Sequence, residues 1–388
     1  MKEPSQEKLV DLLGQYQAGR LDEAEALALA LVADFPEHQF GWKVLGAALK
    51  RKGRVEESLV SMRRSAQLMP DDAEAQSNLG VTLLELGRLE EAAKNLVRAV
   101  KLRPDFPEAH YNLGVTLHQL GKLEDAEAAY EKAIMLEPNY AEAYNNLGNI
   151  LQEFGKLDAA EANYRRAILL KPDYVDGHYN LGISGQKQGR LADAEVSFLQ
   201  VLKLRPNHAE AQNNLANTLL ELGRLNEAEE SAMQAVASRP ESADAYYNLG
   251  NIVRLQGRLE DAGISYRRSI GIKPDFAEAH GNLGATLYEL GRLTEGEDSC
   301  RQAISFNPDL AEPYSTLANV LSDLGALDEA ELNYRKAINL QPSLSNTRAA
   351  LGDLLMRKGR HVEGLYEKAL GSGVICFRAS SGMSIREE

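Results

Sequence analysis

Apolar residues recur at every third or fourth position through most of the chain, which is the spacing of amphipathic helices. A typical stretch spans 141–174, where the apolar positions are Leu147, Ile150, Leu151, Leu157, Ala160, Tyr164, Ala167 and Ile168. Alternating strand-like patterns are lacking before residue 372. The pattern predicts an all-α fold made of short amphipathic helices that pack in pairs.

Glycine and proline divide this helical pattern at a fixed interval. Prolines recur with constant spacing from Pro36 through Pro70 to Pro342, and glycines recur at the same interval from Gly19 to Gly359. A third series runs from Gly46 to Gly352, with alanine at two of its positions. Three series with one period indicate a tandem repeat in which each unit is a pair of helices.

Each series has a structural interpretation. Proline lacks an N–H group and disfavours helix before it, so it ends the second helix of a unit. The Gly19 series follows the first helix, where glycine adopts the left-handed conformation of a helix cap. The Gly46 series lies within the first helix, where glycine costs about 1 kcal/mol relative to alanine. We expect it to permit close approach of the second helix.

The residues at the repeat positions resemble the tetratricopeptide consensus. The matching residues are Trp42, Leu45 and Gly46 in one unit and Tyr144, Leu147, Gly148, Ala160, Tyr164, Ala167 and Pro172 in another. The resemblance implies an α-solenoid, a right-handed superhelix whose first helices line a concave groove. We expect ten units over 5–344, a degenerate capping unit over 345–370, and an extended or hairpin tail over 371–388.

The composition and charge of the chain limit the classes of partner that it can bind. The formal net charge is −14, whereas nucleic-acid binding and adsorption to anionic membranes both need excess lysine and arginine. The two cysteines form no disulfide framework, and the first twenty residues lack the apolar core of a signal peptide. We therefore expect a cytoplasmic protein that binds neither nucleic acid nor membranes.

No constellation of side chains suggests catalysis. His110, His178 and His280 occupy the repeat position that holds Trp42 elsewhere, so we interpret them as packing residues. Cys300 takes a position that is aromatic in most units and is expected to be a buried, inert thiol. Metal-ligand spacings and nucleotide-binding motifs are lacking, so we expect no enzyme activity, no cofactor and no metal.

One polar series stands out inside the first helices. An asparagine directly before the leucine of each first helix recurs in seven consecutive units, at Asn78, Asn112, Asn146, Asn180, Asn214, Asn248 and Asn282. We call these the ladder asparagines. An amide side chain offers a donor and an acceptor, which match the main chain of an extended peptide. The series is similar to the asparagine ladder in the repeats of O-linked N-acetylglucosamine transferases, which implies a role in gripping extended polypeptide.

Other residues of the first helices join this candidate site. They are a second asparagine set three residues further on (Asn149, Asn217 and Asn251) and tyrosines beside the ladder (Tyr111, Tyr179 and Tyr247). The positions where related domains carry carboxylate-clamping lysines hold acids instead, such as Glu142, Glu210, Glu278 and Glu312. The competing interpretation is that the asparagines and tyrosines only join neighbouring helices.

These observations predict a non-catalytic scaffold that binds a protein or peptide in extended conformation. One alternative is the substrate-recognition arm of a larger enzyme, of the glycosyltransferase, sulfotransferase or oxygenase type. Another is a self-assembling module or homodimer, for which small and apolar residues of one second helix form a candidate patch: Ser231, Ala232, Met233 and Ala235.

Overall fold

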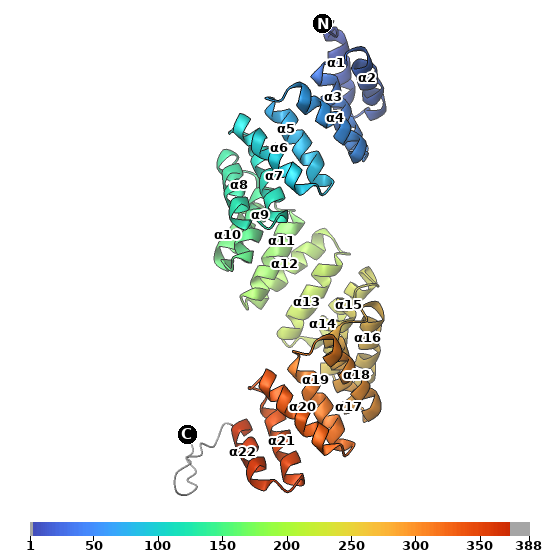
Figure 1. Cartoon of the computed structure of the whole chain (residues 1–388), viewed down its shortest axis with the longest axis vertical. Helices are drawn as coiled ribbons and strands as arrows, with labels where there is room; N and C mark the ends of the chain where they lie inside the picture. Colours follow the sequence, from blue (N-terminus) through green and yellow to red (C-terminus); the bar gives the residue numbers. More distant parts are fainter. Residues whose placement is uncertain (1–2, 373–388) are drawn as a thin grey trace. The chain divides into compact units, whose positions relative to one another are not determined.

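The computed structural model describes residues 3–372, which form helices joined by short turns, with no strand in that range (Figure 1). The chain divides into two compact parts, a first half (residues 1–188) and a second half (residues 189–388). The helices of the first half are α1 (Gln6–Gln17), α2 (Leu21–Asp34), α3 (Gln39–Arg51), α4 (Val55–Leu68), α5 (Ala73–Glu85), α6 (Leu89–Leu102), α7 (Pro107–Gln119), α8 (Leu123–Leu136), α9 (Ala141–Glu153), α10 (Leu157–Leu170) and α11 (Val175–Lys187). Those of the second half are α12 (Leu191–Leu204), α13 (Ala209–Glu221), α14 (Leu225–Ser238), α15 (Ala243–Leu255), α16 (Leu259–Ile272), α17 (Ala277–Glu289), α18 (Leu293–Phe306), α19 (Ala311–Asp323), α20 (Leu327–Leu340), α21 (Ser345–Arg357) and α22 (His361–Ser372).

The turn within each helix pair depends on glycine. Every residue of the Gly19 series has a positive φ, between 69° at Gly87 and 84° at Gly325. A side chain with a Cβ atom is disfavoured in this left-handed region, so the glycines end the first helices as predicted.

The glycine inside the first helix lets the second helix pack closely against it. A Cβ atom built on Gly148 would lie 2.6 Å from the ring of Tyr164, and one on Gly250 would lie 2.6 Å from the ring of Tyr266. Both rings are fully buried. The helical cost of glycine is thus offset by burial of a large aromatic side chain, which confirms the expected close approach.

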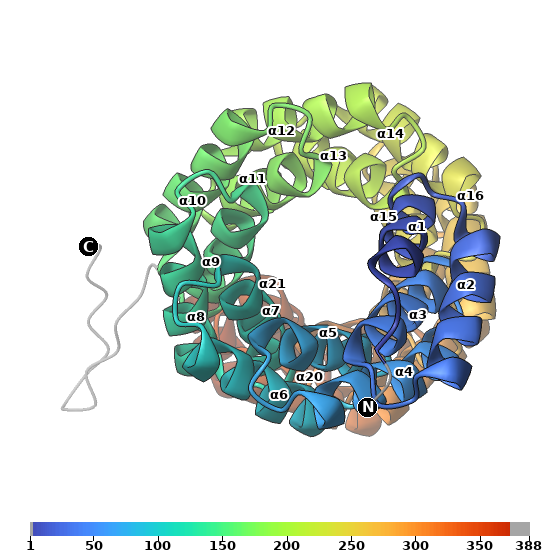
Figure 2. The ribbon, with the colours of Figure 1, turned by 90° about the horizontal axis from the view of Figure 1, so that it is seen from above.

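First and second helices have different neighbours within each half. First helices of successive pairs pack directly on one another, as α7 does on α5 and α9, and α17 does on α15 and α19. In Figure 2, α5, α7 and α9 lie on the inner side of the first half, and α6, α8 and α10 lie on the outer side. In the second half α13 and α15 are likewise inside α14 and α16. Side chains on the free face of the first helices therefore face a concave surface.

Two expectations need comment. The proposed outer patch on α14 is wrong for three of its four residues, since Ser231, Ala232 and Ala235 are buried between helices and only Met233 is exposed. They are small because the neighbouring helix lies close, not because they meet a partner. The tail expected over 371–388 begins with two residues that belong to α22, and residues 373–388 lie outside the described part of the chain.

Candidate functional site

In several repeats, a residue near the start of the first helix bonds to the turn that precedes it. The ring Nε2 atoms of His110, His178 and His280 lie 2.9–3.0 Å from the carbonyl oxygen of the proline six residues earlier. Trp42 donates to the corresponding proline carbonyl at 2.8 Å. These histidines therefore hold the turn between repeats, and burial lowers the pKa of His110.

The ladder asparagines lie in the middle of successive first helices, from α5 to α17, and all are half-buried. Each ladder asparagine is more exposed than a core residue and less exposed than a residue on the free face of the helix. Each of these residues therefore keeps part of its surface accessible to solvent.

In the first half, the ladder joins neighbouring repeats. Asn146 Nδ2 donates to the hydroxyl oxygen of Tyr111 at 3.1 Å, and Asn180 Nδ2 donates to Oδ1 of Asn145 at 3.0 Å. In both bonds the acceptor lies 35 residues earlier, directly before the ladder asparagine of the preceding repeat. The competing interpretation is thus correct for one hydrogen of each of these amides.

The second half repeats this arrangement. Asn248 donates to Oδ1 of Asn213 at 2.9 Å, and Asn282 donates to the Tyr247 hydroxyl at 3.2 Å. Asn282 Nδ2 also lies 2.8 Å from Oδ1 of Asn251, so its two hydrogens are both used. Asn214 and Tyr179 are half-buried at the corresponding positions of α13 and α11.

The N-terminal end of the ladder is less constrained. Among the described residues, Asn112 bonds only its own helix, through the Glu108 carbonyl at 2.7 Å. The side chain of Asn78 has no hydrogen bond to another residue within 3–372. Neither amide is bound to the preceding repeat, and Asn78 is the most available of the series.

The position directly before each ladder asparagine carries more of the site than the sequence analysis recognised. It alternates between tyrosine and asparagine over five repeats: Tyr111, Asn145, Tyr179, Asn213 and Tyr247. Only the tyrosines were named as candidates, and Asn145 and Asn213 were missed. The alternation from one repeat to the next was the available signal, because hydroxyl and amide oxygens both accept hydrogen bonds.

The second asparagine set has a structural partner in most repeats. Oδ1 of Asn149 accepts from the Tyr164 hydroxyl at 2.9 Å, and Oδ1 of Asn251 accepts from Tyr266 at 2.8 Å. Burial raises the pKa of both tyrosines well above the usual range, so their hydroxyls stay protonated donors. Asn217 has no such partner, because Ala232 takes the repeat position that these tyrosines hold.

A hollow of about 650 Å³ lies on α1, α3 and α5 of the first half, and we call it the N-terminal hollow. Its acids are neutralised by nearby lysines. Lys43 Nζ lies 2.6 Å from Glu74, and Lys50 Nζ lies 2.9 Å from Glu85. Arg51, which also lines the hollow, donates to a backbone carbonyl. Positive side chains outnumber negative ones in this lining.

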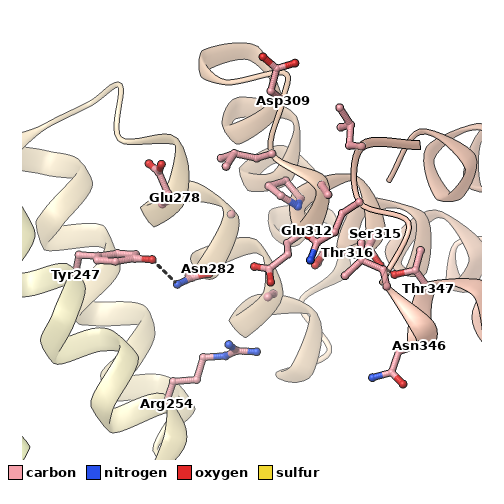
Figure 3. Close-up of a pocket in the computed structure, with 18 residues that line it drawn as sticks. Tyr247, Arg254, Glu278, Asn282, Asp309, Glu312, Ser315, Thr316, Asn346 and Thr347 are labelled. Atoms are coloured by element: carbon pink, nitrogen blue, oxygen red, sulfur yellow. Dashed lines mark hydrogen bonds between the residues drawn. The ribbon is translucent and has the colours of Figure 1, made fainter. Parts of the chain in front are cut away.

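A second hollow of about 650 Å³ lies on α15, α17, α19 and α21, and we call it the C-terminal hollow (Figure 3). Glu278 and Glu312 line it from the first turns of α17 and α19, and Asp309 lines it from the turn before α19. Asn282 faces it with its bond to Tyr247 in place. Negative side chains dominate this lining, since Arg254 is its single lysine or arginine.

A row near the end of the first helices also links repeats. His118 Nε2 lies 2.7 Å from a Glu153 oxygen, and the Tyr288 hydroxyl donates to Asp323 at 3.1 Å. Arg254 is held by Glu289 of the next first helix in the same way. These side chains therefore join successive first helices.

The remaining chemical candidates are inert. Cys300 is fully buried, and burial raises the pKa of its thiol to about 12, which disfavours the nucleophilic thiolate. Among the described residues, no group of three histidine, cysteine or acidic side chains could hold a metal ion. Within 3–372 no helix is both long and apolar enough to cross a membrane.

Comparison with known proteins gives the family. Models described as tetratricopeptide repeat match residues 13–73, 61–96, 107–140, 129–162, 179–236, 213–275, 277–310 and 311–344, and one described as TPR repeat matches 82–121 and 153–189. Arrays of stacked helix pairs present extended concave binding surfaces. The chain belongs to the tetratricopeptide-repeat family.

Several solved structures resemble parts of the chain. YrrB, described as a TPR protein with an unusual peptide-binding site, is 26% identical over 48% of this chain and 96% of its own, with a TM-score of 0.43. MamA is 25% identical over 43% and 97%, with a TM-score of 0.39. PilF of Pseudomonas aeruginosa is 21% identical over 52% and 92%, with a TM-score of 0.48. No curated protein was found to match the chain.

Proposed function

We propose that the chain is a non-catalytic scaffold that binds an extended peptide or protein segment on the concave face of its first helices. The ladder asparagines hydrogen-bond the main chain of that segment. The observation that carries the proposal is the unused hydrogen-bonding capacity of these half-buried amides.

An asparagine side chain has two N–H donors and an oxygen that can accept twice. Asn180 and Asn248 each use one donor to bind the preceding repeat, which leaves one N–H and the oxygen. Asn112 also keeps one N–H and its oxygen, and Asn78 keeps both N–H groups and its oxygen. An amide that is anchored through one hydrogen is already oriented, so a ligand loses less entropy in pairing with it.

Main-chain pairing makes recognition depend on peptide N–H groups more than on side chains. The test begins with a displayed library of random twelve-residue peptides, selected on the full 388-residue chain. The strongest binder is then synthesised with single backbone N-methyl groups, and fluorescence anisotropy gives each Kd. We expect N-methylation at several positions to weaken binding about tenfold, because a neutral hydrogen bond contributes about 1 kcal/mol and the methyl group also clashes.

The protein side is tested with Asn112→Ala combined with Asn180→Ala, for which we expect at least tenfold weaker binding. The matched control is Tyr164→Phe, which removes a hydrogen bond behind the ladder and leaves every ladder amide in place. Circular dichroism checks that all variants are folded. Failure to select any peptide, or a Kd that neither N-methylation nor the double variant changes, would refute the proposal.

A further inference from the structure

The acids of the C-terminal hollow have no cation beside them. Within residues 3–372, no ion pair joins Glu278, Asp309 or Glu312 to a lysine, arginine or histidine. Arg254, which shares the lining, is bound to Glu289 instead. The hollow therefore carries exposed acids without ion-pair partners on a concave lining, where the electric field of like charges adds up.

The same repeat position is neutralised in some other repeats. Glu210 pairs with Arg239 at 2.5 Å, and Glu142 pairs with Lys171 at 3.3 Å. Each of these partners is the residue that caps the C-terminus of the second helix in the same repeat. The corresponding caps in the repeats of Glu278 and Glu312 are uncharged, namely Asn307 and Gln341. Glu108, Asp176 and Asp244 hold the same repeat position and also have no ion pair within residues 3–372, so the hollow is distinguished by bringing two such acids into one concave lining.

The Asn282 amide, which also lines the hollow, can pair only with a hydrogen-bond donor of the ligand. Both hydrogens of the Asn282 amide are taken, by the Tyr247 hydroxyl and by Oδ1 of Asn251, so only its oxygen is free to bind. This preference of Asn282 for a donor is independent of the charges of Glu278 and Glu312. The lining near α17 therefore presents acceptors, and it matches a ligand rich in N–H donors.

We propose that the C-terminal hollow binds a lysine or arginine side chain of the extended peptide, with Glu278 and Glu312 contacting its charged head. This rests on the proposed function, because the ladder positions the peptide main chain. The volume of about 650 Å³ is typical of pockets that enclose a ligand group. Charge complementarity then sets which peptide, and which register, is bound.

The test applies the random twelve-residue library to three full-length proteins: the natural chain, the Glu278→Gln/Glu312→Gln variant, and a Glu142→Gln/Glu210→Gln control. The control removes two acids of the same repeat position that already have partners. We expect the natural chain and the control to select peptides with lysine or arginine fixed at one position. Replacing that residue by glutamine in the best peptide should raise its Kd at least tenfold.

The Glu278→Gln/Glu312→Gln variant should still select peptides, but without the basic residue, and should bind the original peptide about tenfold more weakly. Selection of peptides with no basic preference by the natural chain overturns this inference and leaves the proposed function standing. The same holds if the basic preference survives in the double variant. If the natural chain selects no peptide, the proposed function fails and the inference fails with it.

Discussion

The N-terminal and C-terminal hollows have opposite linings, although the repeats near them carry the same set of ion pairs. In the first half, Glu25 on α2 binds Lys52 at 2.6 Å and Arg54 at 2.7 Å. In the second half, Glu331 on α20 binds Lys358 at 2.6 Å and Arg360 at 2.7 Å. The two sets of residues occupy the same positions of the repeat, near opposite ends of the chain.

The concave side differs at the position directly before the ladder position. In the N-terminal hollow this residue is Lys43, which binds Glu74 of the next repeat. In the C-terminal hollow the residues that stand in the same relation to Glu278 and Glu312 are Tyr247 and Gly281, which carry no charge. The charge of the groove therefore differs at a position that the ion pairs of Glu25 and Glu331 do not use, so it can vary without them.

The largest expected effect is on the frame of the C-terminal hollow. Gly250→Val should destabilise the protein by about 3 kcal/mol or more, because even a Cβ atom would lie 2.6 Å from the buried Tyr266 ring. Urea unfolding measures the loss. The control is Gly271→Ala in α16, where a Cβ meets nothing within 4 Å, and it should be neutral or stabilising by up to about 1 kcal/mol. Equal stabilities of the two variants would contradict the packing argument.

The second largest effect is expected at Glu331, which binds Lys358 and Arg360. Burial alone would raise the pKa of Glu331, but hydrogen bonds from Lys358, Arg335 and Arg360 outweigh it and lower the pKa to about 2. A carboxyl with a lowered folded-state pKa stabilises fully above its unfolded value, near 4.5, and loses that effect as the pH falls towards 2. Glu331→Gln should therefore cost about 1–2 kcal/mol at pH 7.

The pH dependence is the diagnostic part of this prediction. The stability difference between Glu331→Gln and the natural chain should shrink steadily between about pH 4.5 and pH 2, in thermal unfolding followed by circular dichroism. Glu25→Gln should also be destabilising, if the two ends share one scaffold. A difference that is constant with pH would show that charge is not the cause.

A smaller effect is expected from moving the lysine of one hollow into the other. Tyr247→Lys places an ammonium group at the repeat position before Glu278 that Lys43 holds before Glu74. We expect the preference for basic peptides to fall about fivefold, since one of the two free acids gains a partner. Tyr247→Phe is the control, because it also breaks the bond to Asn282 but adds no charge. If both variants lose the preference equally, charge compensation is not the reason.

The smallest effect belongs to the reverse change. Lys43→Gln removes a surface ion pair whose glutamate is half exposed, so stability should fall by less than about 1 kcal/mol. The N-terminal hollow would then hold a free Glu74. Urea unfolding measures the change, and a loss well beyond the range of surface ion pairs would mean that this pair is part of the frame, contrary to the comparison.

Sequence alone predicted most of the fold. Glycine and proline act through local backbone geometry, so their spacing located the turns, and the apolar period located the helices. The ladder was placed correctly on the first helices. Bonds between neighbouring helices were one of two interpretations, but their partners were not predicted, because they depend on which side chains of different repeats can reach each other, as between Asn180 and Asn145. Lys43 was overlooked for the same reason, since its role depends on an acid in the next repeat.

The hydrogen bonds between Asn146 and Tyr111 and between Asn180 and Asn145 also make the repeats interchangeable. Removing residues 141–174 would bring Asn180 opposite Tyr111, and that hydroxyl would accept its hydrogen as the Asn145 oxygen does now. The array can therefore lose this repeat, or gain a copy of it, without losing the bond at the joint. A gene encoding such a chain can change length by duplication or deletion of the segment for one repeat, and each product inherits a continuous row of amides.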